Sequence, residues 1–254
     1  MGRNLCAELR NIQDGKRRVS GAPSIGSSGD LIIEEIFEFD VDTDPALLDE
    51  FCQKADFVFN LAGVNRPKEQ SEFMEGNFGF AQILLDTLKK HKNICPVMIS
   101  SSTQAALENP YGESKRAGEE LMFRYSRESG ARVLVYRFPN LFGKWCRPNY
   151  NSAVATFCHN IANDLPISIS NRENRLSLVY IDDLVNEMIA ALRGQEHRDG
   201  DVNSNGDRDG NSNSNSNSNS NSNSISNSNS QATGQGSYCF VPEVYDVTLG
   251  EIVD

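Results

Sequence analysis

The sequence predicts an α/β protein built on a Rossmann-like, doubly wound parallel sheet. Short apolar segments rich in branched and aromatic residues alternate with longer stretches of helical periodicity, and polar residues directly follow several of the apolar segments. Strands that alternate with helices form βαβ units, so the strands should run parallel and their carboxyl ends should meet at one edge of the sheet. A ligand is expected at that edge.

Each element can be justified from its composition and spacing. Four segments are expected to form strands, in this order: DLIIEEIFEFD (30–40), ADFVFNLAG (55–63), ICPVMISSS (94–102) and ARVLVYRFP (131–139). Helices are expected at 44–54, 72–90, 111–129 and 151–163. The last residues, TLGEIVD (248–254), look like the first turns of a helix that Thr248 caps.

An alternation of Asn and Ser fills most of residues 203–230. Such a tract is too polar to bury and too repetitive to specify one packing, which predicts a disordered insert at 201–236. Residues 237–254 are expected to complete the domain that begins at residue 1. A second, shorter insertion at 15–30 is expected to form a long loop.

The composition excludes several classes of protein. A hydrophobic content of 38% in 254 residues is sufficient for a core, to which Trp145 and Phe157 are expected to belong, whereas a formal charge of −11 disfavours a nucleic-acid partner. Six cysteines lie far apart without zinc-like spacing, which predicts reduced thiols, a cytoplasmic location and no metal site. No apolar run approaches about 18 residues, so no membrane partner is expected.

The heptapeptide NPYGESK (109–115) places Tyr111 one helical turn ahead of Lys115. Positions i and i+4 share one face of a helix, so the phenol and the ammonium should point in the same direction. About 0.2 such pairs are expected by chance in this composition, so the spacing alone is a weak signal. Its position strengthens it, because the pair follows a strand that ends in Ser100, Ser101 and Ser102.

This arrangement suits hydride transfer with a nicotinamide cofactor. An adjacent ammonium favours the phenolate and is expected to lower the pKa of Tyr111, which would make the phenol a usable proton donor near neutral pH. A hydroxyl at the strand end, such as that of Ser102, can orient the carbonyl of a substrate. The predicted chemistry is therefore the reduction of a ketone, with the proton supplied by Tyr111.

Four stretches resemble the extended short-chain dehydrogenase/reductase family, the NAD-dependent epimerase/dehydratases of nucleotide sugars: LAGVNRP (61–67), SSSTQAALENPYGESK (100–115), RFPNLFGKW (137–145) and YIDDLV (180–185). Residues 140–163 and 244–254 further resemble the reductase domain of the CapF-type enzymes of capsular-polysaccharide synthesis. The resemblance implies that residues 1–200 form an NAD(P)-binding reductase domain whose substrate-binding portion begins near residue 140. The implied reaction is NAD(P)H-dependent reduction of a UDP-linked 4-keto-6-deoxy-N-acetylhexosamine to the 4-hydroxy nucleotide sugar.

The resemblance also implies roles for individual residues. Tyr111 would be the catalytic acid, Lys115 its partner and a ribose ligand, and Ser102 the group that orients the keto oxygen. The other implied cofactor contacts are Leu61, Ala62, Gly63, Asn77, Ser100 and Phe138. The other implied substrate contacts are Arg66, Asn140, Lys144, Asn151 and Arg175, among which the arginines suit a diphosphate because a planar guanidinium binds two oxygens at once.

Simpler explanations stay open for several of these residues. Gly63 also fits the end of a strand, and Asn140 also fits the turn of a loop. Arg66 and Arg175 also fit a solvated surface. Asp182, in the YIDDLV stretch, equally fits a helix N-cap.

The beginning of the chain departs from the family. Family members begin with a buried strand and a glycine-rich turn that approaches the cofactor diphosphate. Here MGRNLCAEL resembles the end of that turn and its helix, and Gly2 is the one cofactor-binding glycine that remains. The first strand and most of the glycine-rich turn are therefore expected to be missing, as in an incomplete chain.

Two further departures bear on the activity. The segment FEFDVDTD (37–44) carries Asp40 and Asp42, and a carboxylate there would accept hydrogen bonds from a ribose diol and repel a 2′-phosphate. This predicts NADH over NADPH as the cofactor. The chain also shows no counterpart of the cupin domain of the CapF type, so the reductase activity alone is expected.

Alternatives to a reductase stay open. A nucleotide-sugar 4-epimerase of the same fold would use the same tyrosine and lysine but would return the hydride. A fragment without the glycine turn would be catalytically silent or would act as an NAD-dependent regulator. A binding module that works through the Asn-Ser tract is a further alternative, although such tracts are usually spacers. The resemblance also suggests a homodimer.

Overall fold

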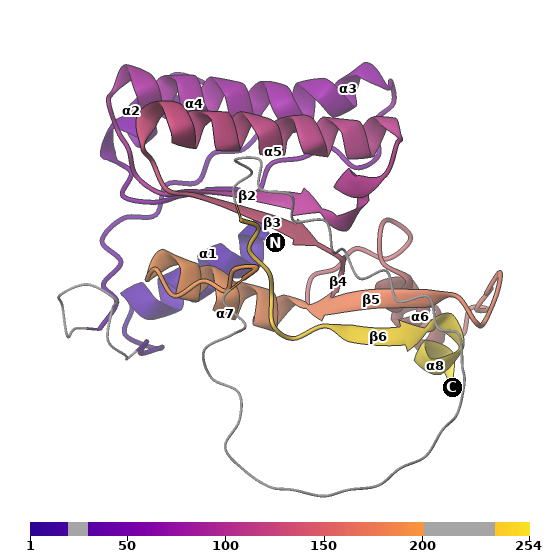
Figure 1. Cartoon of the computed structure of the whole chain (residues 1–254). Helices are drawn as coiled ribbons and strands as arrows, with labels where there is room; N and C mark the ends of the chain where they lie inside the picture. Colours follow the sequence, from indigo (N-terminus) through magenta and orange to yellow (C-terminus); the bar gives the residue numbers. More distant parts are fainter. Residues whose placement is uncertain (20–29, 201–236) are drawn as a thin grey trace, which may run out of the picture.

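The computed structural model describes residues 1–19, 30–200 and 237–254, which form an α/β fold with two sheets (Figure 1). The disordered insert predicted at 201–236 and most of the loop predicted at 15–30 lie outside the described residues. Across the ranges that are described, no helix has the length and hydropathy needed to span a bilayer.

The first sheet is parallel and its strands lie in the order β1 (Val58–Asn60), β2 (Val97–Ser102) and β3 (Val133–Phe138). Val97 pairs in register with Val58 on one side and with Val133 on the other, so β2 is the central strand. Next to β3, the Cys239 N–H donates to the Val135 carbonyl at 2.9 Å. The parallel pairing confirms the predicted βαβ arrangement.

Helices cover both faces of this sheet (Figure 1). One face packs on α2 (Leu47–Lys54), α4 (Phe80–Lys90) and α5 (Pro110–Ser129), and the other packs on α1 (Gly2–Gln13) and α7 (Ile181–Leu192). Alternate residues of β2 serve the two cores, because Met98 packs with the α1 and α7 side and Ile99 with the α4 and α5 side. Burial on both faces is what a parallel sheet requires.

The helical stretch predicted at 72–90 forms as three consecutive pieces. A short helix α3 (Ser71–Met74) runs into a π-helical turn η1 (Glu75–Gly79), and α4 follows without a break. A π-helical turn inserts an extra residue per turn and is frequent at functional sites. In this turn Asn77 is buried, whereas its neighbours on the turn are more exposed.

The second sheet begins at Asn140, directly after β3. It comprises β4 (Asn140–Phe142), β5 (Arg175–Tyr180) and β6 (Tyr245–Thr248), with β4 and β5 parallel and β5 and β6 antiparallel. Two helices belong to this part of the chain, α6 (Ala153–Ala162) and α8 (Leu249–Val253). Thr248 caps α8 in a reciprocal pair with Glu251, which confirms the predicted cap.

The prediction of a strand at 30–40 is wrong. Its apolar side chains are used, because Leu31, Ile33 and Ile36 pack against one core and Phe39 against the other. The segment nevertheless forms no ladder in the described part of the chain. An apolar alternation reports burial, whereas a strand also needs a neighbour that accepts and donates its backbone hydrogen bonds.

One side-chain prediction is also wrong. Trp145 is not in the core but is 51% exposed, and its backbone is left-handed (φ 64°) in the loop after β4. The guanidinium carbon of Arg3, in the first turn of α1, lies 4.3 Å from the centroid of its ring. The N-cap role, one of the two that stay open for Asp182 from the sequence, is not the one it has, since Tyr180 caps α7 and Asp182 lies in the first turn. Phe157 is buried as predicted.

Candidate active site

The carboxyl end of β2 leads directly into the helix that carries Tyr111. After Ser102 a single 3-10 turn, η2 (Thr103–Ala106), connects β2 to α5. Asn109 caps α5, because its Oδ1 accepts a hydrogen bond from the Gly112 N–H at 2.8 Å. Pro110 occupies the first turn, where its missing N–H costs no intrahelical bond. These local features hold Tyr111 beside the end of the strand.

Gly112 allows α5 to approach η2 closely. A Cβ at this position would lie 2.4 Å from the carbonyl oxygen of Gln104 and 2.5 Å from that of Leu107. Both obstacles are backbone atoms, which cannot move aside as a flexible side chain can. The glycine within YGESK therefore sets the separation between α5 and the strand-end loop, and with it the position of the phenol.

Lys115 is the buried cation of the site. Its side chain is 8% exposed, and its Nζ donates a hydrogen bond to the Ser100 carbonyl at 3.1 Å. The chain after β1 passes close by, because a Cβ on Gly63 would lie 2.9 Å from Nζ. Nζ also lies 5.9 Å from the centroid of the Tyr111 ring. The structure thus brings together the ends of β1 and β2 and the start of α5, as the sequence predicts.

Asn77 ties these segments together. Its Oδ1 accepts from the Val64 N–H at 3.0 Å, while its Nδ2 donates to the Val64 carbonyl at 3.1 Å and to Ser114 Oγ at 2.9 Å. Both amide hydrogens are therefore used within the protein. The structure gives this predicted cofactor contact a clear positioning role between η1, the turn after β1, and α5.

Burial has the largest effect on the pKa of Lys115 and on that of Tyr111. It lowers the pKa of Lys115 to about 8, and Glu119 opposes this shift. It raises the pKa of Tyr111, and the hydrogen bond with Ser102 opposes that shift in turn. The predicted lowering of the Tyr111 pKa is therefore wrong for this structure, because desolvation of the phenol outweighs any effect of the nearby ammonium.

Two of the predicted substrate contacts lie together. Arg66 Nε donates to Asn151 Oδ1 at 2.8 Å. The guanidinium carbons of Arg66 and Arg147 lie 5.2 and 5.6 Å from the centroid of the same ring, that of Tyr150. In the described residues neither guanidinium has an ion-pair partner. The sequence analysis did not identify Arg147 and Tyr150 as site residues. Both lie in the stretch CRPNY (146–150), where an arginine close to a tyrosine was the pattern that could have indicated them.

The other predicted substrate contacts lie on the second sheet or beside it. Lys144 Nζ forms an ion pair with Asp182 at 2.9 Å. Arg175 lies in β5 opposite Thr248 of β6, on the side of α8. Asn140 is exposed and opens β4. No hydrogen bond, ion pair or ring contact joins these three residues to Tyr111 in the part of the chain that the structure describes.

The remaining predicted cofactor contacts differ in their surroundings. Leu61 and Ala62 follow β1 on the way to Gly63. Phe138 ends β3, buried against the Tyr136 ring with centroids 5.4 Å apart. Asp40 is exposed and its Oδ1 accepts from the Val41 N–H. Gly2 begins α1 with nothing within 4 Å of the place of a Cβ, so no close backbone approach requires a glycine there.

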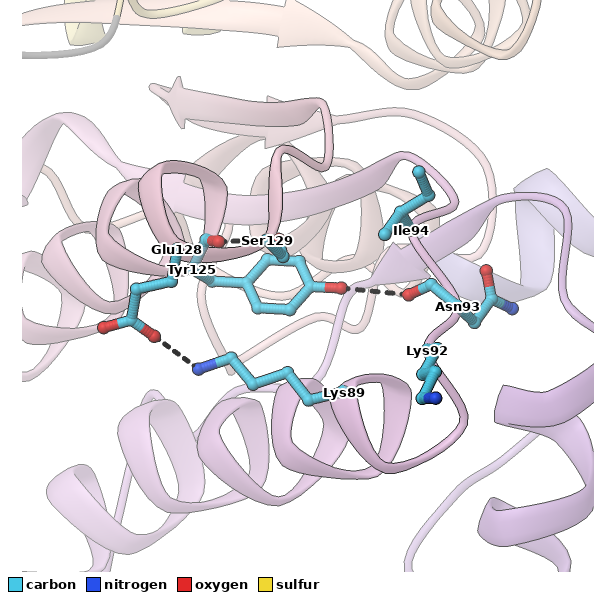
Figure 2. A pocket seen from close by; sticks show the side chains of 7 residues that line it. All are labelled: Lys89, Lys92, Asn93, Ile94, Tyr125, Glu128 and Ser129. Atoms are coloured by element: carbon cyan, nitrogen blue, oxygen red, sulfur yellow. Dashed lines mark hydrogen bonds and ion pairs between the residues drawn. The ribbon is translucent and has the colours of Figure 1, made fainter.

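A cavity of about 340 Å³ lies at the other end of α5 (Figure 2). Lys89, Asn93 and Tyr125 line it, and Figure 2 shows the Tyr125 hydroxyl pointing at the Asn93 carbonyl, to which it donates at 3.2 Å. Tyr125 lies 14 residues after Tyr111, which is about 21 Å along a helix. The cavity is therefore separate from the Tyr111 site. The described residues contain no cluster of His, Cys, Asp or Glu that could hold a metal.

Comparisons with known proteins point to one family. The family described as the NAD dependent epimerase/dehydratase family matches residues 1–203. A UDP-2-acetamido-2,6-beta-L-arabino-hexul-4-ose reductase from Pseudomonas aeruginosa is 40% identical over 195 residues, which cover 77% of this chain and 47% of the relative. The chain thus spans about half the length of this relative.

Two solved structures have similar folds. The capsular polysaccharide assembling protein CapF from Staphylococcus aureus matches with a TM-score of 0.69 and 35% identity, over 100% of this chain and 53% of that chain. A UDP-glucuronic acid 4-epimerase from Bacillus cereus, solved with NAD, matches with a TM-score of 0.53 and 24% identity, over 62% and 55% of the two chains. The second likeness supports the fold alone.

Replacing Lys115 with Met is expected to stabilise the fold at pH 7. With a folded-state pKa of about 8 against 10.5 in the unfolded chain, burial of the ammonium costs free energy below pH 8, and methionine removes a cost of up to about 3 kcal/mol. Between pH 8 and 10.5 the unfolded chain binds the extra proton, so the wild type gains stability as the pH rises and the difference narrows.

Urea unfolding of both proteins at pH 7 and at pH 9.5 measures this difference. The exposed Lys68→Met variant is the control and should match the wild type at both pH values. A Lys115→Met protein that is less stable than the wild type at pH 7, or a difference that does not narrow at pH 9.5, would show that burial of the charge is not the controlling cost.

Proposed function

The chain belongs to the NAD-dependent epimerase/dehydratase family, and we propose that it is a nucleotide-sugar 4-keto reductase. The proposed reaction converts a UDP-linked 4-keto-6-deoxy-N-acetylhexosamine into the 4-hydroxy nucleotide sugar at the expense of NADH or NADPH. The observation that carries the proposal is the meeting of Tyr111, Lys115 and Ser102 where β2 ends and α5 begins. The name of the Pseudomonas aeruginosa relative, a hexul-4-ose reductase, supports this class of substrate.

The surroundings of Lys115 fit a nicotinamide cofactor. An ammonium carries three N–H donors, and the structure uses one of them, toward the Ser100 carbonyl. The bare Cα of Gly63 keeps open the space beside Nζ that a Cβ would fill. Lys115 would hold the ribose hydroxyls there, with Leu61 and Ala62 lining the same strand end. When bound, the cofactor supplies the hydride for the carbonyl carbon of the substrate.

Tyr111 would supply the proton for the oxygen of that carbonyl. Its raised pKa keeps the phenol protonated at neutral pH, as a general acid must be. Ser102 hydrogen-bonds the phenol and would hold the same substrate oxygen. As the carbonyl oxygen of the substrate gains negative charge, it becomes a stronger base than the phenolate of Tyr111 and takes the proton. Lys115 would stabilise the phenolate that proton transfer leaves behind.

Replacing Tyr111 with Phe tests the proton donor. Loss of a general acid costs about 10²- to 10⁴-fold in rate, so NADH oxidation with the UDP-4-keto sugar should fall by that factor while NADH binding, followed by nicotinamide fluorescence, should persist. Tyr125→Phe, on the same helix but beside the distant cavity, is the matched control and should keep the wild-type rate. Equal rates for Tyr111→Phe and the wild type would rule out Tyr111 as the acid.

Arg66 and Arg147 are proposed to hold the diphosphate of the substrate. Two guanidiniums near one ring repel each other unless an anion lies between them, and both lack an ion-pair partner among the described residues. A guanidinium binds two oxygens of a diphosphate in one plane. Asn151 would orient Arg66, to which it is hydrogen-bonded. Lys144, Asn140 and Arg175 are proposed as further contacts toward the sugar.

The Arg147→Ala variant tests this assignment. Loss of a charge-assisted hydrogen bond should weaken UDP binding by about tenfold, or about 1.4 kcal/mol, in a calorimetric titration. Arg124→Ala removes an exposed guanidinium from α5 and should leave the UDP affinity unchanged. The same affinity for Arg147→Ala and Arg124→Ala would place the diphosphate elsewhere.

NADH is proposed as the preferred cofactor because of Asp40. A carboxylate accepts hydrogen bonds from the ribose diol and repels a 2′-phosphate. The Asp40→Ala variant should therefore bind NADPH more tightly relative to NADH, by about tenfold, and the Asp86→Ala variant, which removes an exposed carboxylate from α4, should not. Comparable turnover of both cofactors by the wild type would contradict the preference.

A 4-epimerase is the second candidate, since it would use the same Tyr111 and Lys115. Stoichiometric consumption of NADH with product identifies the reductase, whereas an epimerase returns the hydride and consumes none. Failure of the chain to bind any dinucleotide would favour a silent fragment instead. We also propose a cytoplasmic homodimer; Ile83 of α4, 57% exposed, is a side chain that a second copy would cover, and light scattering of the purified chain decides the point.

A further inference from the structure

A buried carboxylate lies one helical turn beyond Lys115. Glu119 is 1% exposed and follows Tyr111 and Lys115 at successive four-residue steps on α5, so the three side chains share one face of the helix. No step of the proposed reaction uses this carboxylate. A fully buried carboxylate is costly unless charges and hydrogen bonds compensate it, which makes its presence beside the site informative.

Three separate segments compensate Glu119. Arg137 of β3 donates to both carboxylate oxygens, from Nε at 2.9 Å and from Nη2 at 2.6 Å. Ser101 Oγ of β2 donates at 2.5 Å. The Tyr238 hydroxyl donates at 3.1 Å and accepts from Arg137 at 2.9 Å, and the Arg137 guanidinium carbon lies 4.2 Å from the centroid of the Tyr238 ring.

We propose that Glu119 is the positioning residue that keeps the Lys115 ammonium charged and in place, and that Arg137 and Tyr238 hold its carboxylate for that role. The charged and titratable groups around the pair come from three elements: Tyr111 and Glu119 on α5, Arg137 on β3 and Tyr238 after the insert. The segments carrying Gly63 and Asn77 face Lys115 with uncharged groups. Glu119 is therefore the one negative charge beside Lys115 in the described residues.

The effect of Glu119 on the pKa of Lys115 agrees with this geometry. Burial lowers the pKa of Lys115 to about 8, and the charge of Glu119 acts in the opposite sense. Arg137 binds both oxygens of the Glu119 carboxylate and fixes its orientation, while Lys115 makes its own hydrogen bond to the Ser100 carbonyl. The inference rests on the proposed cofactor-binding role of Lys115, but the charge state of Lys115 can be measured without any cofactor.

Competitive acetylation provides that measurement. Acetic anhydride reacts with the neutral amine alone, so the acetylation rate at Lys115 as a function of pH, read by peptide mass spectrometry, reports its titration midpoint. The wild-type midpoint is expected near pH 8. In Glu119→Gln it should move to lower pH, whereas Glu120→Gln, which removes the adjacent exposed carboxylate from the same helix, should leave it unchanged. An unchanged midpoint in Glu119→Gln overturns the proposal.

A double variant protects the test against misfolding. Glu119→Gln leaves Arg137 buried without its partner, so Glu119→Gln/Arg137→Met removes both charges together, a change that buried ion pairs often tolerate. Loss of Arg137 also removes a positive charge near Lys115 and offsets part of the effect, so the double variant should show a smaller downward shift, and a midpoint at or above the wild-type value overturns the proposal. NADH binding at pH 8 should weaken roughly fivefold in Glu119→Gln and less in the double variant, in step with the loss of charge on Lys115. If wild-type NADH binding is absent at every pH, the proposed function fails while the acetylation result still decides the role of Glu119.

Discussion

Burial of β2 on both faces is the constraint on which the rest of the structure depends. This strand has a parallel neighbour on each side and a helical layer on each face, so its carboxyl end is the one place where its backbone and side chains can reach a ligand. The strand ends there in three serines, Ser100, Ser101 and Ser102, and each makes a different contact. The first offers its carbonyl to Lys115, the second holds Glu119, and the third meets the phenol of Tyr111.

Burial of the Lys115 ammonium costs free energy of folding but places a positive charge at the end of β2. An ammonium that is 8% exposed is costly, and the structure supplies it with one carbonyl and a nearby carboxylate rather than with a direct ion pair. A direct pair would occupy a further donor of the ammonium and neutralise the charge that a ligand would meet. The arrangement therefore gives up stability and keeps donors of Lys115 for the cofactor that we propose it binds, which is a common compromise at functional sites.

What could be predicted from the sequence follows local spacing. The Tyr111 and Lys115 pair, the helix start before it and the Thr248 cap are decided by residues within one or two turns, and the structure confirms the helices that carry them. The surroundings of these residues are not local. Tyr238 reaches Glu119 across 119 positions of sequence, and no pattern relates the two. The direction of the Tyr111 pKa was likewise out of reach, because it depends on how deeply the fold buries the phenol.

The two ends of the 201–236 segment are fastened to each other. The Asp199 N–H donates to the Tyr238 carbonyl at 2.9 Å and the Phe240 N–H donates to the His197 carbonyl at 3.1 Å, so the chain leaves and re-enters the domain at the same place. The fold therefore sets no particular length between these anchors, and doubling a loop costs only about 0.6 kcal/mol. Residues can therefore be added to or removed from the Asn-Ser tract at little cost in folding free energy, while Tyr238 keeps its hydrogen bond to Glu119 of α5.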